Sequence, residues 1–122
     1  MESMEMRDKM RIVQELVPGR QITLAHVIAN PDPILYQKMG LDPKLDYQRA
    51  AIGVLTISPA ETAVITADIA LKASGAELGF VDRFSGTLII TGTVDEVEAS
   101  FGAITTYFKN TLKFSVCDVT RT

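Results

Sequence analysis

The residues best suited to acid–base, nucleophilic or metal chemistry are scarce in this chain, which has one histidine and one cysteine. His26 lies in an alternating apolar run that places it on one strand face with Ile22, Leu24 and Ile28. No serine or cysteine stands beside it in a nucleophile motif, and a histidine in such a row is more often a hydrogen-bonded packing residue. Cys117 alone cannot close a disulfide or hold a metal within one chain, and we interpret it as a small packing residue. We therefore predict no catalysis, no metal and no cofactor.

Charged residues beside apolar segments have simpler explanations than catalysis. Glu96 and Glu98 begin a predicted helix, where the helix dipole favours negative charge. Asp82 and Arg83 precede Phe84-Ser85-Gly86 at the tip of a predicted hairpin, which fits either a solvated turn or a binding edge. No glycine-rich phosphate loop and no metal-ligand spacing is found. From its residues alone, the chain is a small α+β domain without a catalytic constellation.

The composition is that of one folded domain. The chain has 122 residues, of which 47% are hydrophobic and 22% are charged, as is typical of globular proteins. Twelve Lys and Arg against 15 Asp and Glu leave a net charge of −3, so there is no basic excess for binding nucleic acid. The charged N-terminus lacks the apolar stretch of a signal peptide, and no apolar run approaches the about 20 residues of a membrane span. We expect a soluble, cytoplasmic protein that binds neither nucleic acid nor membrane.

The N-terminal part is predicted to contain a tail and two strands. Residues 1–10 interleave methionines with charges and are expected to form a mobile tail. Residues 11–17 alternate weakly and predict a short strand before the turn at Pro18-Gly19. Residues 21–29 predict a second strand, which ends at a stretch rich in proline.

Two connections and a buried strand are predicted next. A short helical turn at 34–39 ends at Gly40, and residues 41–48 read as a surface loop. The apolar, β-branched run at 51–57 is typical of a strand that is covered on both faces.

The following helix has clear signals at both ends. Ser58-Pro59-Ala60-Glu61 reads as a capping box with proline at the first helical position, and Gly75 is the expected stop. At 100° per residue, a stripe of small and apolar residues is predicted to face a sheet: Ala60, Ala63, Val64, Ala67, Ala70 and Leu71. The opposite stripe is polar except for one residue, Ile65, and consists of Glu61, Ile65, Asp68 and Lys72.

A hairpin and a second helix complete the pattern. Residues 77–84 and 87–93 predict two strands joined at Ser85-Gly86, a loop short enough to force an antiparallel hairpin. Thr93 and Glu96 form a second capping signal. Apolar residues then recur at spacings of four, three and four, as expected of a helix that reaches about residue 110: Val97, Phe101, Ile104 and Phe108.

The element order predicts the fold class. Residues 114–120 read as the last strand, so from residue 51 onward the order is strand, helix, strand, strand, helix, strand. This is the split βαβ pattern of a ferredoxin-like α+β sandwich, to which the preceding strand and short helix would be an added unit. Such a fold carries many unrelated functions and does not decide among them.

Three separated segments carry a resemblance that covers about residues 11–122: VPGRQITLAHVIA at 17–29, AIGVLTI at 51–57 and LGFVDRFSG at 78–86. In this order they closely resemble the circularly permuted, EutS/PduU-type shell proteins of bacterial microcompartments, and the final CDVTRT also resembles the C-terminus of that family. The resemblance divides the chain into a tail at 1–10, a barrel strand and turn at 11–20, and a permuted shell domain at 21–122.

The resemblance implies a structural role in the microcompartment shell. It implies a cyclic homohexamer that tiles the shell, with other shell proteins, around an enzyme core, for example for ethanolamine, propanediol or choline breakdown. Targeting peptides of cargo enzymes are a further candidate partner. In the family, six N-terminal strands form a small parallel barrel over the central pore, which here would be built from Ile12, Val13, Gln14, Glu15, Leu16 and Val17.

The resemblance also assigns roles to a loop and an edge. The hairpin tip corresponds to the pore loop, so Asp82, Arg83, Phe84, Ser85 and Gly86 are candidate pore residues. Six copies of a charged pair around one axis would favour ions of one sign. The helix that carries the edge lysine of shell hexamers is matched around Lys72, and contacts between neighbouring hexamers would use Ile65, Asp68, Lys72 and Arg121.

Two other functions stay open at this point. The chain could be a small oligomeric regulatory domain of ferredoxin-like fold, in which residues 82–86 bind a metabolite. A small enzyme that uses His26 is the more remote alternative.

Overall fold

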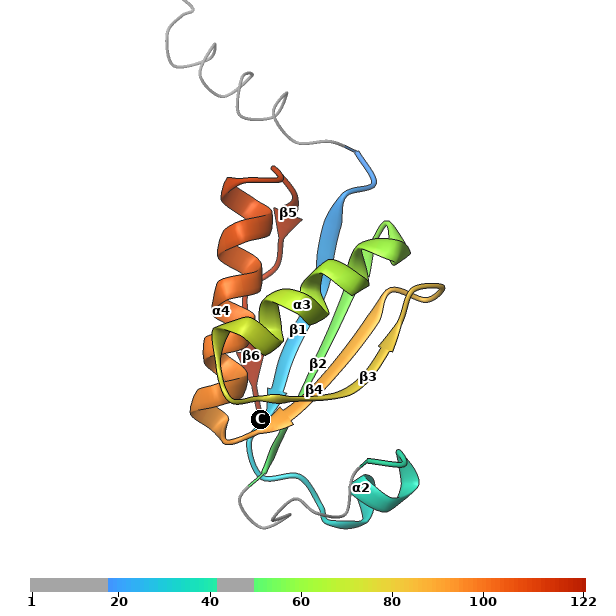
Figure 1. The fold of residues 1–122 in the computed structure, drawn as a ribbon, viewed down its shortest axis with the longest axis vertical. Coiled ribbons are helices and arrows are strands. Elements are labelled where there is room, and N and C mark those ends of the chain that lie inside the picture. The colour runs from blue at the N-terminus through green and yellow to red at the C-terminus, as the bar shows by residue number, and fades with distance from the viewer. Residues whose placement is uncertain (1–17, 42–49) are drawn as a thin grey trace, which may run out of the picture.

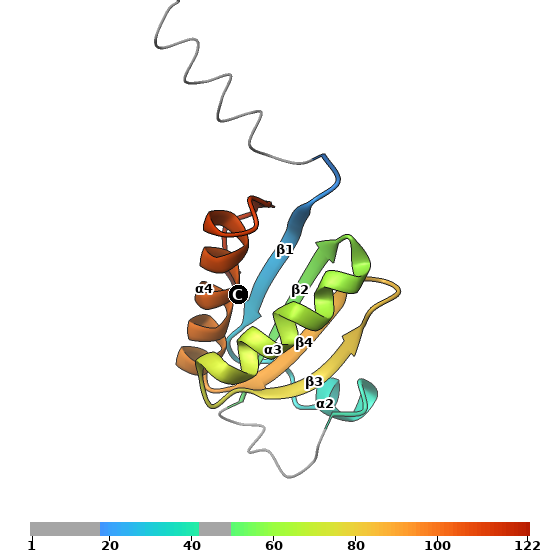
Figure 2. The ribbon, with the colours of Figure 1, turned by 45° about the horizontal axis from the view of Figure 1, so that its top comes forward.

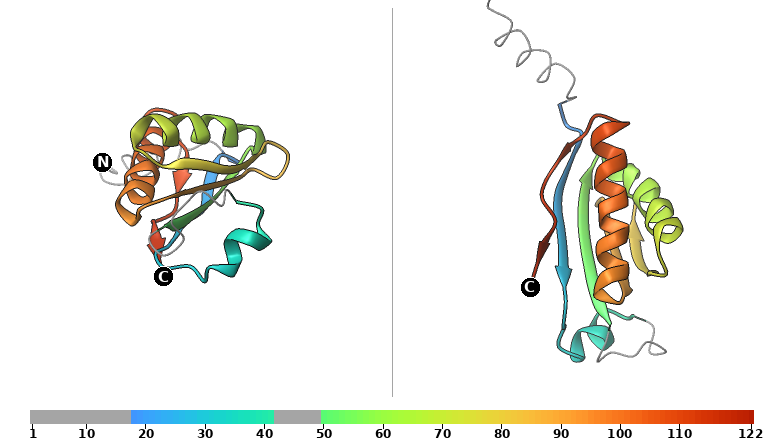
Figure 3. Two further views of the ribbon diagram at one scale, coloured as in Figure 1. Left: turned by 60° about the horizontal axis from the view of Figure 1, so that its bottom comes forward. Right: turned by 90° about the vertical axis from the view of Figure 1, so that its left-hand side faces the viewer.

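The computed structural model of this chain describes residues 18–41 and 50–122. The predicted tail at 1–10, the predicted strand at 11–17 and all of the predicted loop except Leu41 lie outside the described residues. The described part is one β-sheet with two long helices on the same face (Figures 1 and 3). In chain order the elements are β1 (Gln21–Ile28), α2 (Ile34–Lys38), β2 (Ala51–Ser58), the 3₁₀ turn η1 (Ala60–Thr62), α3 (Ala63–Ala73), β3 (Glu77–Asp82), β4 (Thr87–Gly92), α4 (Val94–Asn110), β5 (Ser115–Val116) and β6 (Thr120–Arg121).

The sheet contains the predicted split βαβ unit. Its strand order is β3-β4-β2-β1-β5, and β6 also pairs with β1. Strand β4 lies between β2 and β3 and is antiparallel to both, so β2, α3 and β3 form a crossover around it. Figure 2 shows α3 over the β3–β4 half of the sheet and α4 beside β1.

Strand β1 is part of this sheet, and the prediction that it is an added unit was wrong. It pairs antiparallel with β2 from Gln21↔Ser58 to Ile28↔Ile52, which is the place that a ferredoxin-like order gives to the last strand. The C-terminal segment lies outside β1 and pairs with it, in parallel, only at β5 and β6. The predicted single strand at 114–120 is therefore two short strands, which pair with β1 because β1 already occupies the edge of β2.

A β-bulge in β1 corrects the predicted faces of that strand. Between Ile22 and Leu24 the register with β2 shifts, so that Leu24 pairs with Thr56 while Ile22 pairs with Ile57. One extra residue reverses the alternation. Ile22 consequently faces the helices and is 2% exposed, whereas Leu24 faces away and is 40% exposed. The hydroxyl groups of Thr23 and Thr56 lie 2.6 Å apart at the bulge.

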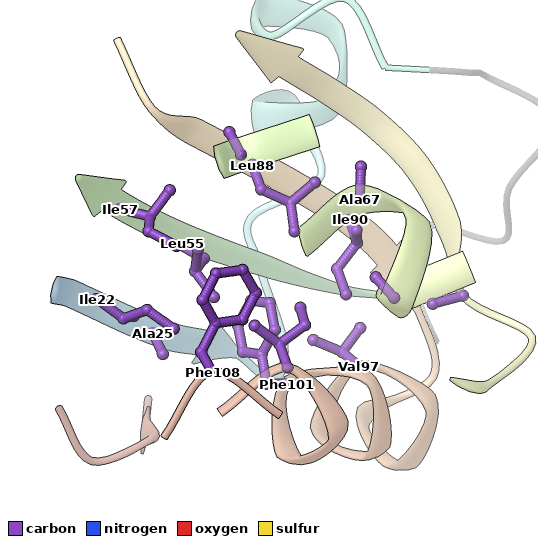
Figure 4. Packing of buried hydrophobic residues seen from close by; sticks show 14 of the residues in the cluster. Ile22, Ala25, Leu55, Ile57, Ala67, Leu88, Ile90, Val97, Phe101 and Phe108 are labelled. Carbon is purple, nitrogen blue, oxygen red and sulfur yellow. The ribbon is translucent and has the colours of Figure 1, made fainter. Parts of the chain in front are cut away.

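The main core lies between the sheet and the two helices. Phe101 and Phe108 of α4 project from one side onto apolar residues of the strands (Figure 4). The buried strand residues at this interface include Ala25, Val27, Leu55, Ile57, Leu88 and Ile90. On the opposite face of the sheet, α2 covers only one end, where Tyr36 packs with Ile52. The sequence predicted a β2 strand that is covered on both faces. In the structure both faces of β2 are covered over only part of its length.

Helix α3 begins later than its capping signal predicted. Ser58 is still in β2, and Pro59 has an extended backbone, with ψ 149°. The carbonyl of Pro59 accepts hydrogen bonds from both the amide (3.0 Å) and the hydroxyl (2.6 Å) of Thr62. These bonds close the 3₁₀ turn η1, and α3 begins after it at Ala63. The predicted box at Ser58 was wrong because the pairing of Ser58 with Gln21 keeps this residue in the sheet.

The buried face of α3 is narrower than predicted. Ala63, Ala67 and Ala70 are buried as expected, whereas Val64 and Leu71 are 52% and 43% exposed. Thr66 is fully buried, because its hydroxyl donates to the carbonyl of Ala63 at 2.6 Å and so needs no water.

Helix α4 begins and packs as predicted. The Thr93 hydroxyl accepts from the amide of Glu96 at 3.1 Å, and Glu96 Oε1 accepts from the amide of Thr93 at 2.9 Å. This completes the capping box. The four apolar residues with spacings of four, three and four are all buried. The Ser100 hydroxyl donates to the carbonyl of Ala70 at 2.7 Å, which joins α4 to α3.

Candidate functional site

The loop between β3 and β4 is held by hydrogen bonds to one carboxylate. Asp82 Oδ1 accepts from the amide of Phe84 at 2.9 Å, and Asp82 Oδ2 accepts from the hydroxyl of Ser85 at 2.9 Å. Thr87 Oγ1 lies 3.0 Å from Ser85 Oγ and extends this network. These hydrogen bonds, that of the Phe84 amide first, lower the pKa of Asp82 below its ordinary value. The carboxylate is therefore ionised near neutral pH and directed into its own turn.

Gly86 fixes the base of this loop to β2. Its amide donates to the carbonyl of Asp82 at 2.9 Å, and its own carbonyl accepts from the amide of Ile57 at 2.9 Å. Gly86 has φ +75°, and a Cβ at this position would collide with the carbonyl oxygen of Ile57. Only glycine fits here without strain.

The two residues at the loop tip project away from the protein. Phe84 is 80% exposed, the most exposed large apolar side chain of the described residues. Arg83 is also exposed, and its Cζ lies 5.0 Å from the centre of the Phe84 ring. This distance is within the range of a cation–π contact. Behind them, Val64 and Val81 help to line a shallow hollow of about 330 Å³.

A second candidate surface is the outer face of α3. Asp68 and Lys72 form an ion pair of 2.9 Å, with side chains 60% and 76% exposed. Ile65 lies one turn before Asp68 on the same helix face and is 42% exposed. The structure thus brings three of the four predicted edge residues together.

Arg121, the fourth predicted edge residue, belongs to a different contact. It lies in β6, and its Nη1 is 3.4 Å from Glu98 Oε2 on α4. Glu98 was predicted only as a helix-start residue, and its pairing with Arg121 was not predicted. No local pattern reveals it, because the two residues are 23 positions apart and meet through the packing of the C-terminal segment.

His26 is a hydrogen-bonded residue of the sheet, which confirms the prediction made for it. Its Nδ1 lies 2.6 Å from Thr120 Oγ1 and its Nε2 lies 2.9 Å from Thr122 Oγ1. Both ring nitrogens are occupied, so His26 holds the C-terminal segment to β1. Cys117 packs half-buried against the main core, and burial raises the pKa of its thiol. Neither residue has the surroundings of a nucleophile or base.

The loop and Lys72 lie at opposite ends of α3, whereas Ile65 is in the first turn of that helix, near the loop. Val64, near the start of α3, lines the hollow behind Phe84. Lys72 is in the last turn of this 11-residue helix, which is about 16 Å long at 1.5 Å per residue. Figure 1 shows the β3–β4 tip at one end of α3 and the start of β3 at the other. The C-terminus lies away from the tip, so Arg121 is also remote from the loop.

The described residues offer no metal site and no membrane helix. Within them, no group of three or more His, Cys, Asp or Glu side chains is close enough to hold a metal ion. None of the helices in the described ranges is long and apolar enough to cross a membrane.

Comparison with known proteins identifies the family. A family model described as "BMC domain" matches residues 51–119. The bacterial microcompartment shell protein PduU of Salmonella typhimurium is 45% identical over 112 residues, which cover 92% of this chain and 93% of that protein. The shell protein CutR of Streptococcus intermedius is 49% identical over 111 residues, 91% of each chain. The chain belongs to the BMC domain family.

Solved structures agree with this assignment. A structure titled "CutR flat hexamer, form 1" is 46% identical, with a TM-score of 0.78, and the match covers 87% of this chain and 94% of that one. A second, titled "CutR Screw, form 1 with 41.9 angstrom pitch", has the same TM-score and covers 86% and 100%. The relatives of this BMC-domain chain are shell proteins and not enzymes, so the prediction of a structural, non-catalytic protein is confirmed.

Proposed function

We propose that this BMC-domain protein is a shell tile, a ring of six chains whose β3–β4 loops surround the axis and whose α3 outer faces form the rim. The observation that carries the proposal is the placement of the exposed Arg83–Phe84 tip and of Lys72 at opposite ends of α3. A ring needs one end of each subunit at its axis and the other at its edge. The hexameric relative CutR, 46% identical, supports six as the number of chains.

The same arrangement accounts for apolar residues left exposed at the sheet. With the hairpin tip at the axis, the strands run from axis to rim and the two sheet edges become the flanks of the subunit. Phe80 and Leu78 of β3 are 48% and 43% exposed, and Leu24 and Val119 near the opposite edge are 40% and 39% exposed. Head-to-tail contact between neighbouring chains would cover both groups.

Contacts between rings would use the outer face of α3. An exposed Asp68–Lys72 pair contributes only a few tenths of a kcal/mol to the fold, so it has little structural reason to be there. Lateral contact would bury Ile65 beside it. Arg121 would join this edge through its position at the rim end, with Glu98 as its partner within the chain.

The chain order fits a circularly permuted shell domain. Strand β1 comes before β2 in the sequence but takes the sheet position that a ferredoxin-like order gives to the strand after the second helix. The match to the BMC domain model begins at residue 51, after β1 and α2. Both observations support a strand moved from the end of the domain to its beginning.

Residues 12–17 would form one strand of a six-stranded barrel that caps the pore. They precede Pro18-Gly19, directly before β1, and their alternation suits a barrel wall. In this role the protein lies in a microcompartment shell around an enzyme core, where its neighbours are other shell proteins. Targeting peptides of cargo enzymes are candidate partners at the barrel.

Deletion of residues 1–17 tests the barrel. Residues 22–114 supply a continuous buried core of their own, so the shortened chain is expected to stay folded and hexameric while its pore opens. Thermal unfolding and electron microscopy of the hexamer would show this. Loss of folded protein, or a pore that stays capped, would contradict a separable barrel.

The solution mass of the full chain tests the function. We expect the mass of six chains by light scattering and, at rising concentration, sheets, tubes or stacked rings by electron microscopy. A stable monomer, dimer or trimer without higher assembly would overturn the proposal. If such a species also showed a saturable thermal shift with a metabolite, of size RT ln(1 + [L]/Kd), a ligand-binding regulatory domain would take its place.

A further inference from the structure

A hollow of about 580 Å³ lies where the end of α2 meets the start of β3 and the last turn of α3. Figure 2 shows α2 beside β3. The volume is within the range of about 300–1,000 Å³ that is typical of small-molecule sites. Three leucines supply apolar walls: Leu41 after α2, Leu71 of α3 and Leu78 of β3. Leu71 and Leu78 are each 43% exposed, so apolar surface is left open at this hollow.

Gly79 of β3 keeps the hollow open. It is one of the lining residues, and a Cβ at this position would lie 2.8 Å from Leu41 Cδ2 and 3.2 Å from the carbonyl oxygen of Ile89. A larger residue would therefore displace the Leu41 wall. Because glycine has no side chain, the space beside β3 stays empty.

Two polar side chains line the same hollow without a partner of their own. Thr91 of β4 is only 2% exposed, and among residues 18–41 and 50–122 its hydroxyl has no hydrogen-bond partner. Buried hydroxyl groups are usually hydrogen-bonded, so this one is available to a ligand. Glu77 is exposed and forms no ion pair within the same ranges. It pairs with Thr91 across the strands, which makes the two side chains neighbours on one face of the sheet.

We propose that this hollow binds a small organic ammonium ion that carries an apolar chain. An ammonium group has three N–H donors and no acceptor. The carboxylate of Glu77 would accept one of these donors in a charge-assisted hydrogen bond, and the hydroxyl of Thr91 would accept another. The leucine walls would remove the apolar chain from water. An anion of the same length would be repelled by Glu77, and a neutral alcohol would lack the charge-assisted hydrogen bond.

This site goes beyond the proposed role as a shell tile, because all of its contacts come from one chain. In the proposed ring the next chain would lie along β3 and add a further wall to the hollow. The expected stoichiometry is therefore one ammonium ion per chain.

Calorimetric titration of the full-length protein with n-hexylammonium tests the site. We expect saturable binding of one ion per chain, and several-fold weaker binding of n-butylammonium because its shorter chain buries less apolar surface. Hexanol and hexanoate are expected to bind at least tenfold more weakly than n-hexylammonium. Absence of saturable n-hexylammonium binding, or equal binding of hexanoate, would overturn the proposal.

Matched glutamate variants identify the residue responsible. Glu77→Gln is expected to weaken n-hexylammonium binding at least tenfold, and Thr91→Val, which keeps the shape of the side chain, to weaken it several-fold. Glu61→Gln is the control, because Glu61 is an exposed glutamate in η1, at the opposite end of α3 from Leu71. It should bind within twofold of the original protein. Unchanged binding in Glu77→Gln, or an equal loss in Glu61→Gln, would overturn the site.

The solution mass, measured on the same samples, separates this inference from the proposed function. One n-hexylammonium ion per chain in a protein that is not a hexamer would support the site and overturn the ring. A hexamer without saturable n-hexylammonium binding would overturn the site and leave the ring in place.

Discussion

Backbone geometry at single residues decides the shape of the hairpin tip. Gly86 adopts φ +75° and lies against the carbonyl of Ile57 and the Cα of Ala60, where a side chain has no room. Gly102 in α4 differs, because a Cβ added there would meet no atom within 4 Å. Two glycines of the same chain therefore predict substitutions of opposite sign.

Gly86→Ala is expected to lower the free energy of unfolding by more than about 2 kcal/mol, from the positive φ and the collision with backbone together. Gly102→Ala is expected to raise it by about 0.5–1 kcal/mol through helix propensity. Denaturant unfolding at one fixed protein concentration measures both. Equal effects of the two substitutions would contradict this account of the loop.

Asp82 gives the loop a dependence on pH. Hydrogen bonds from the Phe84 amide and the Ser85 hydroxyl lower the pKa of Asp82 in the folded protein. A group whose folded pKa lies below its unfolded value of about 3.9 stabilises the fold above that pH. This contribution disappears as the pH falls through the folded pKa.

Asp82→Asn is therefore expected to melt below the original protein at pH 5–6, with the difference shrinking toward pH 2. Thermal melts across this range measure it, and Asp95→Asn, an exposed residue in the first turn of α4, serves as the comparison. Parallel curves for the original protein and Asp82→Asn would contradict the role of the carboxylate.

Elements differ in how far local signals determine their ends. Helix α4 starts at its capping box because Thr93 and Glu96 are free to satisfy each other's backbone amides. Helix α3 does not start at the capping motif of Ser58, because pairing with β1 holds Ser58 in β2. A capping motif thus determines the start of a helix only where its first residue is not paired in the sheet.

The capping box of α4 predicts a measurable loss. Thr93→Ala is expected to lower the free energy of unfolding by about 1 kcal/mol. Thr93→Ser is expected to retain most of the stabilisation that the cap provides. Thr106→Ala, on the exposed side of the same helix, should change it by less than about 0.5 kcal/mol. Equal losses for Thr93→Ala and Thr106→Ala in chemical denaturation would show that the cap contributes nothing.

At the scale of the whole molecule, the outer face of α3 is expected to act between rings and not within a chain. The Asp68–Lys72 pair is largely exposed, so Lys72→Ala should cost at most a few tenths of a kcal/mol in stability. We expect Lys72→Ala to keep the mass of six chains and to form sheets or tubes only at a higher protein concentration than the original protein.

Light scattering and electron microscopy of Lys72→Ala test this expectation. Lys109→Ala is the control, since Lys109 is an exposed helix lysine near the end of α4, which starts beside the end of α3 and runs away from it. Unchanged assembly in Lys72→Ala, or equal loss in Lys109→Ala, would remove Lys72 from the rim.

The sequence by itself determined the features that local physics controls. Four features were predicted from residues alone: the apolar spacing of α4, the hairpin that turns at Ser85-Gly86, the packing role of His26 and the split βαβ order. Each depends on neighbours within a few positions or on simple periodicity. The family resemblance, confirmed by the relatives, was also readable from three short segments.

Only the tertiary structure decided the features that need distant residues to meet. Four such features join positions far apart in the chain: the place of β1 beside β2, the bulge at Thr23, the bonds of His26 to Thr120 and Thr122, and the pairing of Arg121 with Glu98. The hydrogen bonds of Asp82 and the approach of Arg83 to the Phe84 ring belong here too, since they exist only in the folded turn. Sequence patterns report which faces are apolar, but three-dimensional packing selects which faces and charges come together.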